Sequence, residues 1–478
     1  MSLTSQAKKG VFWTFLQQFS VQGINFIVQI VLARLLIPSD FGLVAMIAIF
    51  VAIGQSLSDS GMTSSLIRNK INTEADYGTV FITNLFISVL IYFIVFFSAP
   101  SVALFYNQNI LTDLLRVYAL IFIISSFYVV QIAKFSKELN FKSQFTFQLP
   151  SVIIGAIVAI IMAQKGYGVW SLIGLNIAQA ISFSIILWLF YRWRPKLIFD
   201  RTVFRGHFNY GYKLTISGII NVIYLNLYKI IIGKAYSPAT VGYFTQADNL
   251  RLFPVNQFSA VLNKVTFPLF ASIQSDDQLK NAYKKALRLV LSSTSAIMFI
   301  LIICAKPLFL VVFGTKWLAS VPFFQILCIA SIFLPIGTYN LNILKVKGRT
   351  DLFLRVEIIK KIIGTVALFI SLTFGIEAIV WTLCITNILF AYINGYFSGK
   401  LISYPLWDQI RNSLAIISVS LLPAILTYLL FQNLIIPIFT SNILQVIMVA
   451  CCYMILYIPL VFFYNKELIN DIKLIFNR

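Results

Sequence analysis

Amide side chains recur at helical spacing in an apolar segment near the start of the chain. Gln18, Gln22, Asn25 and Gln29 follow one another at intervals of four, three and four residues within residues 11–35. On a helix these intervals place all four side chains on one face. Amides can hydrogen-bond to water and to hydroxyl-rich ligands, or they can join one transmembrane helix to another. A stripe of four amides over three turns favours a water-lined wall over a helix contact.

A second polar stripe lies in residues 211–233. Asn221, Tyr224 and Tyr228 recur there at helical spacing, and Lys229 lies on an adjacent face. Tyr228 stands at the end of the segment, where it could equally anchor the helix at the membrane interface. Asn221 and Tyr224 lie too deep for that role. We therefore expect the two stripes to form two walls of one polar cavity.

Two opposite charges lie within the next apolar segment, residues 239–264. Asp248 and Arg251 are one helical turn apart, and Arg251 lies roughly 18 Å along a helix from Ala239 at the outer end. That depth is close to the middle of a bilayer, where a charge is costly. The pair can be structural, each side chain neutralising the other. Alternatively, the guanidinium can face the cavity and bind a diphosphate bidentately. Both interpretations stay open at this point.

Two further charges lie near the cytoplasmic ends of their apolar segments. Asp59 and Lys264 are therefore expected at the rim or gate of a cavity rather than at its centre. Asp59 and Asp248 are also the candidates for coupling a conformational change to a proton or sodium gradient, because burial shifts the pKa of a carboxylate.

Residue patterns of enzymes are missing from the sequence. It contains no Gly-rich phosphate loop with a Lys, no nucleophile beside a base and no cluster with metal-ligand spacing. All five cysteines lie in apolar stretches, where they act as small hydrophobic residues. The single histidine, His207, falls in a predicted basic loop, where a satisfied or solvated side chain is expected. We predict that the chain is not an enzyme and uses no cofactor or metal.

Composition identifies the elements that must position these side chains. The chain is 59% hydrophobic and 11% charged, with a mean hydropathy of +0.88. A soluble globular protein has about 25% charged residues, so this is an integral membrane protein. It divides into about fourteen apolar stretches that are long enough for transmembrane helices. The longest polar interval, Tyr191 to Lys213, is too short to form a separate soluble domain.

The distribution of cations predicts the orientation of these helices. With the N-terminus in the cytoplasm, 28 of the 37 Lys and Arg residues fall in cytoplasmic segments and five in external ones. Cytoplasmic loops carry such an excess of positive charge, so we expect both termini to be cytoplasmic. The same cations account for the net charge of +21. They are spread over separate loops, which indicates contact with anionic lipid head groups rather than nucleic acid.

A short motif recurs at an offset of 200 residues. Residues 29–43 read QIVLARLLIPSDFGL and residues 229–243 read KIIIGKAYSPATVGY, so that Pro38 matches Pro238 and Gly42 matches Gly242. Each copy ends one apolar segment and begins the next. Because six spans separate the copies, both units enter the membrane from the same side, as parallel repeats do. We predict an all-α fold with two six-helix lobes, 1–200 and 201–400, and an added hairpin with a cytoplasmic tail, 401–478.

Several motifs resemble one family of membrane proteins. They are LARLLIPSDFGLVAM (32–46), SDSGMTSSLIRNK (58–70), VGYFTQADNLR (241–251), VVFGTKWLASVPFFQIL (311–327) and KVKGRTDLFLR (345–355). As a set they resemble the bacterial Wzx-type oligosaccharide flippases, the polysaccharide-export branch of the multidrug/oligosaccharidyl-lipid/polysaccharide exporter superfamily. The similarity extends over the first twelve spans.

The resemblance implies a function and a place in the cell. It implies two lobes around a hydrated cavity that opens to alternate faces of the bacterial inner membrane. The expected substrate is an undecaprenyl-diphosphate-linked oligosaccharide used for lipopolysaccharide, capsule or exopolysaccharide. Assembly proteins, such as a polymerase and a chain-length regulator, are candidate partners beside the membrane lipids. The resemblance also implies that Arg251 and Lys229 serve the diphosphate, and that polar or aromatic residues serve the sugars.

Other functions compete with this interpretation. A multidrug antiporter of the same superfamily would favour acidic and apolar groups in the cavity, whereas this chain has deep cations. A glycan polymerase or ligase would need a long external loop, and a scaffold subunit would not need the polar stripes. Peptidoglycan-precursor flippases carry arginines in the first helix, whereas this chain has Gln22, Asn25 and Gln29 there, so that cargo is disfavoured.

Overall fold

The computed structural model describes the backbone of residues 3–464. Its side chains are described except at 3–12, 14, 15, 18, 256–265, 267, 268, 463 and 464. Within this range the chain consists of helices and short connections, without a strand. The chain forms two compact units, residues 1–242 and 243–478. The prediction of an all-α membrane fold is confirmed.

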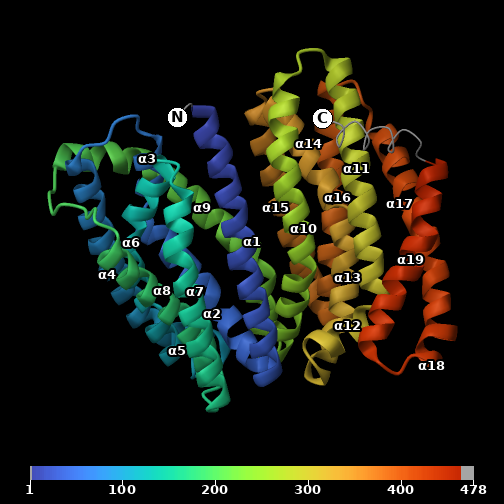
Figure 1. Ribbon diagram of the computed structural model, residues 1–478, viewed down its shortest axis with the longest axis horizontal. Coiled ribbons are helices and arrows are strands. Elements are labelled where there is room, and N and C mark those ends of the chain that lie inside the picture. The colour runs from blue at the N-terminus through green and yellow to red at the C-terminus, as the bar shows by residue number, and fades with distance from the viewer. Residues whose placement is uncertain (1–2, 465–478) are drawn as a thin grey trace. The chain divides into compact units, whose positions relative to one another are not determined.

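The first unit contains helices α1 to α9 (Figure 1). They are α1 (Leu3–Leu35), α2 (Pro38–Asp59), α3 (Met62–Arg68), α4 (Glu74–Tyr106), α5 (Leu111–Tyr118), α6 (Leu120–Lys137), α7 (Phe141–Gln164), α8 (Trp170–Phe190) and α9 (Arg201–Ala235). Helix α1 packs along α7, and α7 along α8. Helix α9 packs on α2, α3 and α4.

The second unit contains most of α10 and all later helices (Figure 1). They are α10 (Pro238–Ser272), α11 (Asp276–Ile303), α12 (Ala305–Val312), η1 (Thr315–Ser320), α13 (Val321–Ile332), α14 (Leu334–Val346), α15 (Thr350–Ser371), η2 (Leu372–Phe374), α16 (Ile376–Leu401), α17 (Leu406–Leu430), η3 (Phe431–Ile435), α18 (Ile436–Ile438) and α19 (Asn442–Tyr464). Helix α14 packs on α16, and α17 packs on both α11 and α19.

Eleven helical segments of the described residues are long and apolar enough to cross a membrane. The other three predicted spans fall on α1, whose apolar part Phe19–Leu35 is shorter, and on α10 and α15, which are not among the eleven. Three predicted spans consist of two successive helices each. Between α2 and α3 the break lies at Ser60 and Gly61, whose φ angles of 48° and 65° are left-handed. Gly adopts this conformation without strain, so the chain can turn there.

The two copies of the repeated motif contact each other in the first unit. A Cβ atom added to Gly42 would lie 1.7 Å from the carbonyl oxygen of Pro238, and one added to Gly242 would lie 2.0 Å from that of Pro38. Each glycine therefore lies against the backbone of the other copy, and no side chain fits there. This reciprocal geometry is what a duplicated motif related by a two-fold axis produces.

Packing and duplication divide the chain at different places. By contacts, α9 belongs to the first unit, since that unit extends to Gly242. The predicted division into 1–200, 201–400 and 401–478 concerns duplication of sequence, and it stays a prediction.

Candidate functional site

Two amides of the α1 stripe are exposed. Gln22 and Asn25 are exposed and Gln29 is half-buried, while the side chain of Gln18 lies outside the described residues. Ile27, on the opposite side of the helix, is 61% exposed. The middle of α1 thus has one exposed polar face and one exposed apolar face. A helix between lipid and a hydrated cavity requires this distribution.

The polar stripe of α9 is less exposed than that of α1. Asn221 is exposed, whereas Tyr224 and Lys229 are half-buried. Ile216 and Ile220 form a separate exposed apolar face on the same helix. Helices α1 and α9 pack on different partners, α1 on α7 and α9 on α2, α3 and α4. That the two stripes line one cavity stays a prediction.

Arg251 is buried and makes three hydrogen bonds within the second unit. Its side chain is only 7% exposed, and its Nε and Nη2 donate to Oδ1 of Asp248 at 2.9 Å and 2.6 Å. Its Nη1 donates to the hydroxyl of Ser331 at 2.8 Å. That hydroxyl in turn donates to the carbonyl oxygen of Leu327 at 2.9 Å.

This arrangement is that of a structural ion pair. Three of the five N–H groups of the Arg251 guanidinium donate to Asp248 and Ser331, so its charge is already neutralised and two N–H groups at most remain for a diphosphate. The geometry therefore favours the structural interpretation of Arg251, and its role as a ligand stays a prediction. Asp248, a candidate for coupling, is held by the same pair.

Asp59 lines a polar cavity of about 270 Å³ in the first unit. The residues around it come from α2, α4 and α6: Gln55, Ser58, Asp59, Asn84, Ser88, Ser125, Ser126, Tyr128 and Val129. The hydroxyl of Thr63 donates to both carboxylate oxygens of Asp59, at 2.7 Å and 2.8 Å. No Lys or Arg among the described side chains lies within salt-bridge distance of this carboxylate.

Several polar atoms in this cavity lack a protein partner. The amide of Asn84 and the hydroxyl of Ser88 are buried and have no hydrogen-bond partner among the described residues. Buried polar groups are normally satisfied, so water or a ligand is required here. Neither residue is predicted from the sequence above, although their spacing of four in an apolar span is a visible signal.

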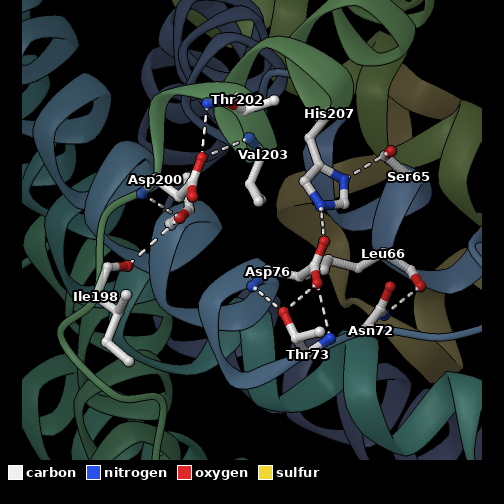
Figure 2. A network of polar contacts seen from close by, with 11 residues as sticks. Ser65, Leu66, Asn72, Thr73, Asp76, Ile198, Asp200, Thr202, Val203 and His207 are labelled. Carbon is white, nitrogen blue, oxygen red and sulfur yellow. Dashed lines mark hydrogen bonds and ion pairs between the residues drawn. The ribbon is translucent and has the colours of Figure 1, made fainter.

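A buried histidine joins three helices near the break between α2 and α3. Figure 2 shows the ring of His207 between Ser65 and Asp76. Its Nδ1 lies 2.8 Å from the Ser65 hydroxyl and its Nε2 lies 3.0 Å from the Asp76 carboxylate. Thr73 donates to the other oxygen of the same carboxylate through its backbone N–H and its hydroxyl. His207 is satisfied, as expected, so this network fixes α9 to α3 and α4.

The prediction that His207 lies in a loop is wrong, because the structure places it in helix α9. Helix α9 begins at Arg201, because the carboxylate of Asp200 accepts the backbone N–H groups of Thr202 and Val203 (Figure 2). Such a cap satisfies N–H groups that the first helical turn leaves free. The helix therefore starts ten residues before the apolar segment and carries His207 into a packed position.

Two further cations lie on α10 and α15. Lys264 lies outside the described side chains, so its predicted role as a gate stays a prediction. Lys360 on α15 is 8% exposed and pairs with Glu357 at 2.5 Å. The charge of Lys360 is thus neutralised within its own helix. Among the described residues, no three His, Cys, Asp or Glu side chains gather as metal ligands do.

Solved structures with the same fold are membrane transporters. The structure titled lipid II flippase MurJ, in an inward closed conformation, aligns with a TM-score of 0.75 and 16% identity, over 96% of this chain and all of that one. An inward-facing multidrug resistance MATE family transporter of the MOP superfamily aligns with a TM-score of 0.59 and 17% identity, over 80% of this chain and 94% of that one. At this identity the likeness establishes the fold alone.

Alignments with relatives named for polysaccharide biosynthesis cover most of the chain. The lipopolysaccharide biosynthesis protein WzxC of Escherichia coli K12 is 24% identical over 78% of this chain and 76% of its own length. The succinoglycan biosynthesis transport protein ExoT of Rhizobium meliloti is 26% identical over 81% of this chain and 79% of its own length. The family model described as polysaccharide biosynthesis protein matches residues 31–322, more than half of the chain. The chain therefore belongs to the polysaccharide biosynthesis protein family of membrane proteins.

Proposed function

We propose that this chain is a flippase for undecaprenyl-diphosphate-linked oligosaccharide repeat units, which it moves from the cytoplasmic to the external leaflet. The relatives support this proposal, since their names concern lipopolysaccharide, teichuronic acid and succinoglycan biosynthesis. The observation that carries the proposal in this chain is the exposed amide face of α1 opposite an exposed apolar face. The product would serve a surface polysaccharide, and a polymerase and a chain-length regulator are proposed partners.

The polar stripes reduce the main cost of the reaction. A hydrated, charged head group loses its water when it enters hydrocarbon, and each unsatisfied polar group then costs several kcal/mol. Amides and phenols can replace that water around sugar hydroxyls. We assign this role to Gln22, Asn25 and Gln29 on α1 and to Asn221 and Tyr224 on α9. The polyprenyl chain needs no such support and stays in lipid.

The orientation and coupling are part of the proposal. We place the protein in the bacterial inner membrane. The excess of Lys and Arg in one set of loops supports an orientation with both termini on the cytoplasmic side. Lys229 is the deep cation proposed to meet the diphosphate, because Arg251 is occupied by Asp248. Asp59 is the proposed coupling group, since it lies in a polar cavity without a cationic partner among the described side chains.

Reconstitution tests this function directly. The purified protein in liposomes should expose a fluorescent lipid-linked oligosaccharide to an added, membrane-impermeant glycosidase faster than empty liposomes do. The triple variant Gln22→Leu, Asn25→Leu and Asn221→Leu should lower this rate by about tenfold, because it removes three partners for sugar hydroxyls. Asn433→Leu, which changes an exposed amide of the C-terminal hairpin, is the matched control and should flip normally.

The outcomes separate the competing functions. Absence of flipping by the wild-type protein for any lipid-linked oligosaccharide, combined with export of a cationic drug, would establish the antiporter instead. Polymerised glycan made by the purified protein alone would establish an enzyme. Normal flipping by the triple variant would show that the polar stripes of α1 and α9 do not contribute to transport.

A further inference from the structure

A basic cavity lies in the second unit, between the third and fourth turns of α11 and the first turns of α17. Its volume is about 410 Å³. Its lining residues are Lys284, Leu287, Arg288, Tyr404, Asp408, Arg411, Asn412, Ser413, Ala415 and Ile416. None of the residues assigned above to the flipping pathway belongs to it.

Positive charge in this cavity exceeds negative charge. Lys284, Arg288 and Arg411 stand against the single carboxylate of Asp408. Neither Lys284 nor Arg411 has a carboxylate within salt-bridge distance in the part of the chain with described side chains. Lys284 and Arg411, which have no such carboxylate, repel each other in one hollow unless an anion neutralises them. The cavity therefore has the charge of an anion site.

The floor of the cavity is rigid. Tyr404, in the turn between α16 and α17, is 2% exposed, and its carbonyl oxygen accepts a hydrogen bond of 2.9 Å from the amide of Gln409. A Cβ atom on Gly399 would lie 2.2 Å from that oxygen, so this close approach requires glycine. The ammonium of Lys284 lies 4.6 Å from the centroid of the Tyr404 ring. Burial raises the pKa of the Tyr404 hydroxyl, which stays neutral.

Polar and apolar lining residues are separated along α17. Arg411 and Asn412 stand one turn before Ala415 and Ile416, whereas on α11 the cations Lys284 and Arg288 lie on both sides of Leu287. Next to this lining, Leu414 is 51% exposed on α17. A ligand that fits would have an anionic head near the beginning of α17 and an apolar part further along that helix.

We propose that this cavity binds the phosphodiester head group of an anionic phospholipid, with its acyl chains along α17. Arginine binds phosphate oxygens through two parallel N–H donors, and lysine adds a point charge. Basic pockets between transmembrane helices bind such head groups at the cytoplasmic surface. Placement in the cytoplasmic leaflet depends on the orientation proposed above, whereas the binding chemistry does not. A bound lipid would join α17 of the C-terminal hairpin to α11.

The test measures lipid binding, so its outcome is independent of flipping. The full-length protein is purified in detergent, and its thermal midpoint is measured in mixed micelles with phosphatidylglycerol, cardiolipin or phosphatidylcholine, and with inorganic phosphate alone. The anionic lipids should raise the midpoint, and cardiolipin, with two phosphodiesters, should do so at lower concentration. Phosphatidylcholine and phosphate should have little effect.

Matched variants locate the site. Lys284→Gln combined with Arg411→Gln should weaken the effect of phosphatidylglycerol by about tenfold in concentration. Lys285→Gln combined with Lys400→Gln removes the same charge from exposed positions outside the cavity and should leave the effect unchanged. An equal loss in the control pair would indicate general attraction to the surface and overturn the proposal. A shift with phosphate alone that equals the lipid's would overturn it in favour of a free-anion site.

Discussion

Replacing Arg251 by methionine should lower the free energy of unfolding by about 3 to 5 kcal/mol, the range for removing one partner of a buried ion pair. The structure supports the lower end of this range. The guanidinium is 7% exposed and gives two hydrogen bonds to Asp248, whose carboxylate remains 15% exposed and so retains some contact with water. Loss of the bond to Ser331 costs less, because that hydroxyl keeps its own bond to the Leu327 carbonyl.

A double variant isolates the pair. Arg251→Met combined with Asp248→Leu removes both charges, so no uncompensated carboxylate stays buried, and the protein should recover to within about 1.5 kcal/mol of wild type. Unfolding in mixed micelles of increasing denaturing detergent measures each free energy. Arg349→Met is the matched control. Arg349 also donates from Nε and Nη2 to one carboxylate, that of Asp351, but both side chains are about half exposed, so little change is expected.

The flipping rates of the same variants decide between the two roles of Arg251. A stable double variant that flips normally would make the pair purely structural. A stable double variant that no longer flips would give the pair a role in transport, through Arg251 as a diphosphate ligand or through Asp248 as a coupling group. If Arg251→Met unfolds like wild type, or if the double variant is less stable than either single variant, the Arg251–Asp248 pair does not stabilise the fold.

Three further predictions follow from buried contacts in the first unit. Gly42→Ala would place a methyl group 1.7 Å from the Pro238 carbonyl oxygen, so thermal melting should show a loss of about 1 to 3 kcal/mol, whereas Gly218→Ala, with nothing within 4 Å, should be neutral or stabilising. An unchanged melting curve for Gly42→Ala would contradict the observed contact. His207→Ala removes the partners of Ser65 and Asp76 and should cost about 1.5 to 3 kcal/mol, again measured by melting; a neutral result would mean that the network does not hold α9. Asp59→Asn should fold normally but make flipping independent of a sodium or proton gradient, and a persisting gradient dependence would exclude Asp59 as the coupling group.

The fold class could be predicted from the sequence because membrane insertion depends on local composition. An apolar stretch of about 20 residues must form a helix in lipid, whatever its neighbours are. The spacing of Gln22, Asn25 and Gln29 likewise fixes their common face, because a helix has one period. The i, i+3 pairing of Asp248 with Arg251 follows from the same geometry.

Contacts between distant segments were decided only by the tertiary structure. Ser331, which accepts a hydrogen bond from Arg251, lies 80 residues away in sequence, and Asn84 reaches the cavity of Asp59 from another helix. Hydropathy detects only the apolar part of α9, so it missed the first turns that place His207 between Ser65 and Asp76. The sequence by itself determined the apolar helices and which of their faces are polar, since both depend on near neighbours. Which polar groups meet depends on how helices pack, and no local pattern contains that information.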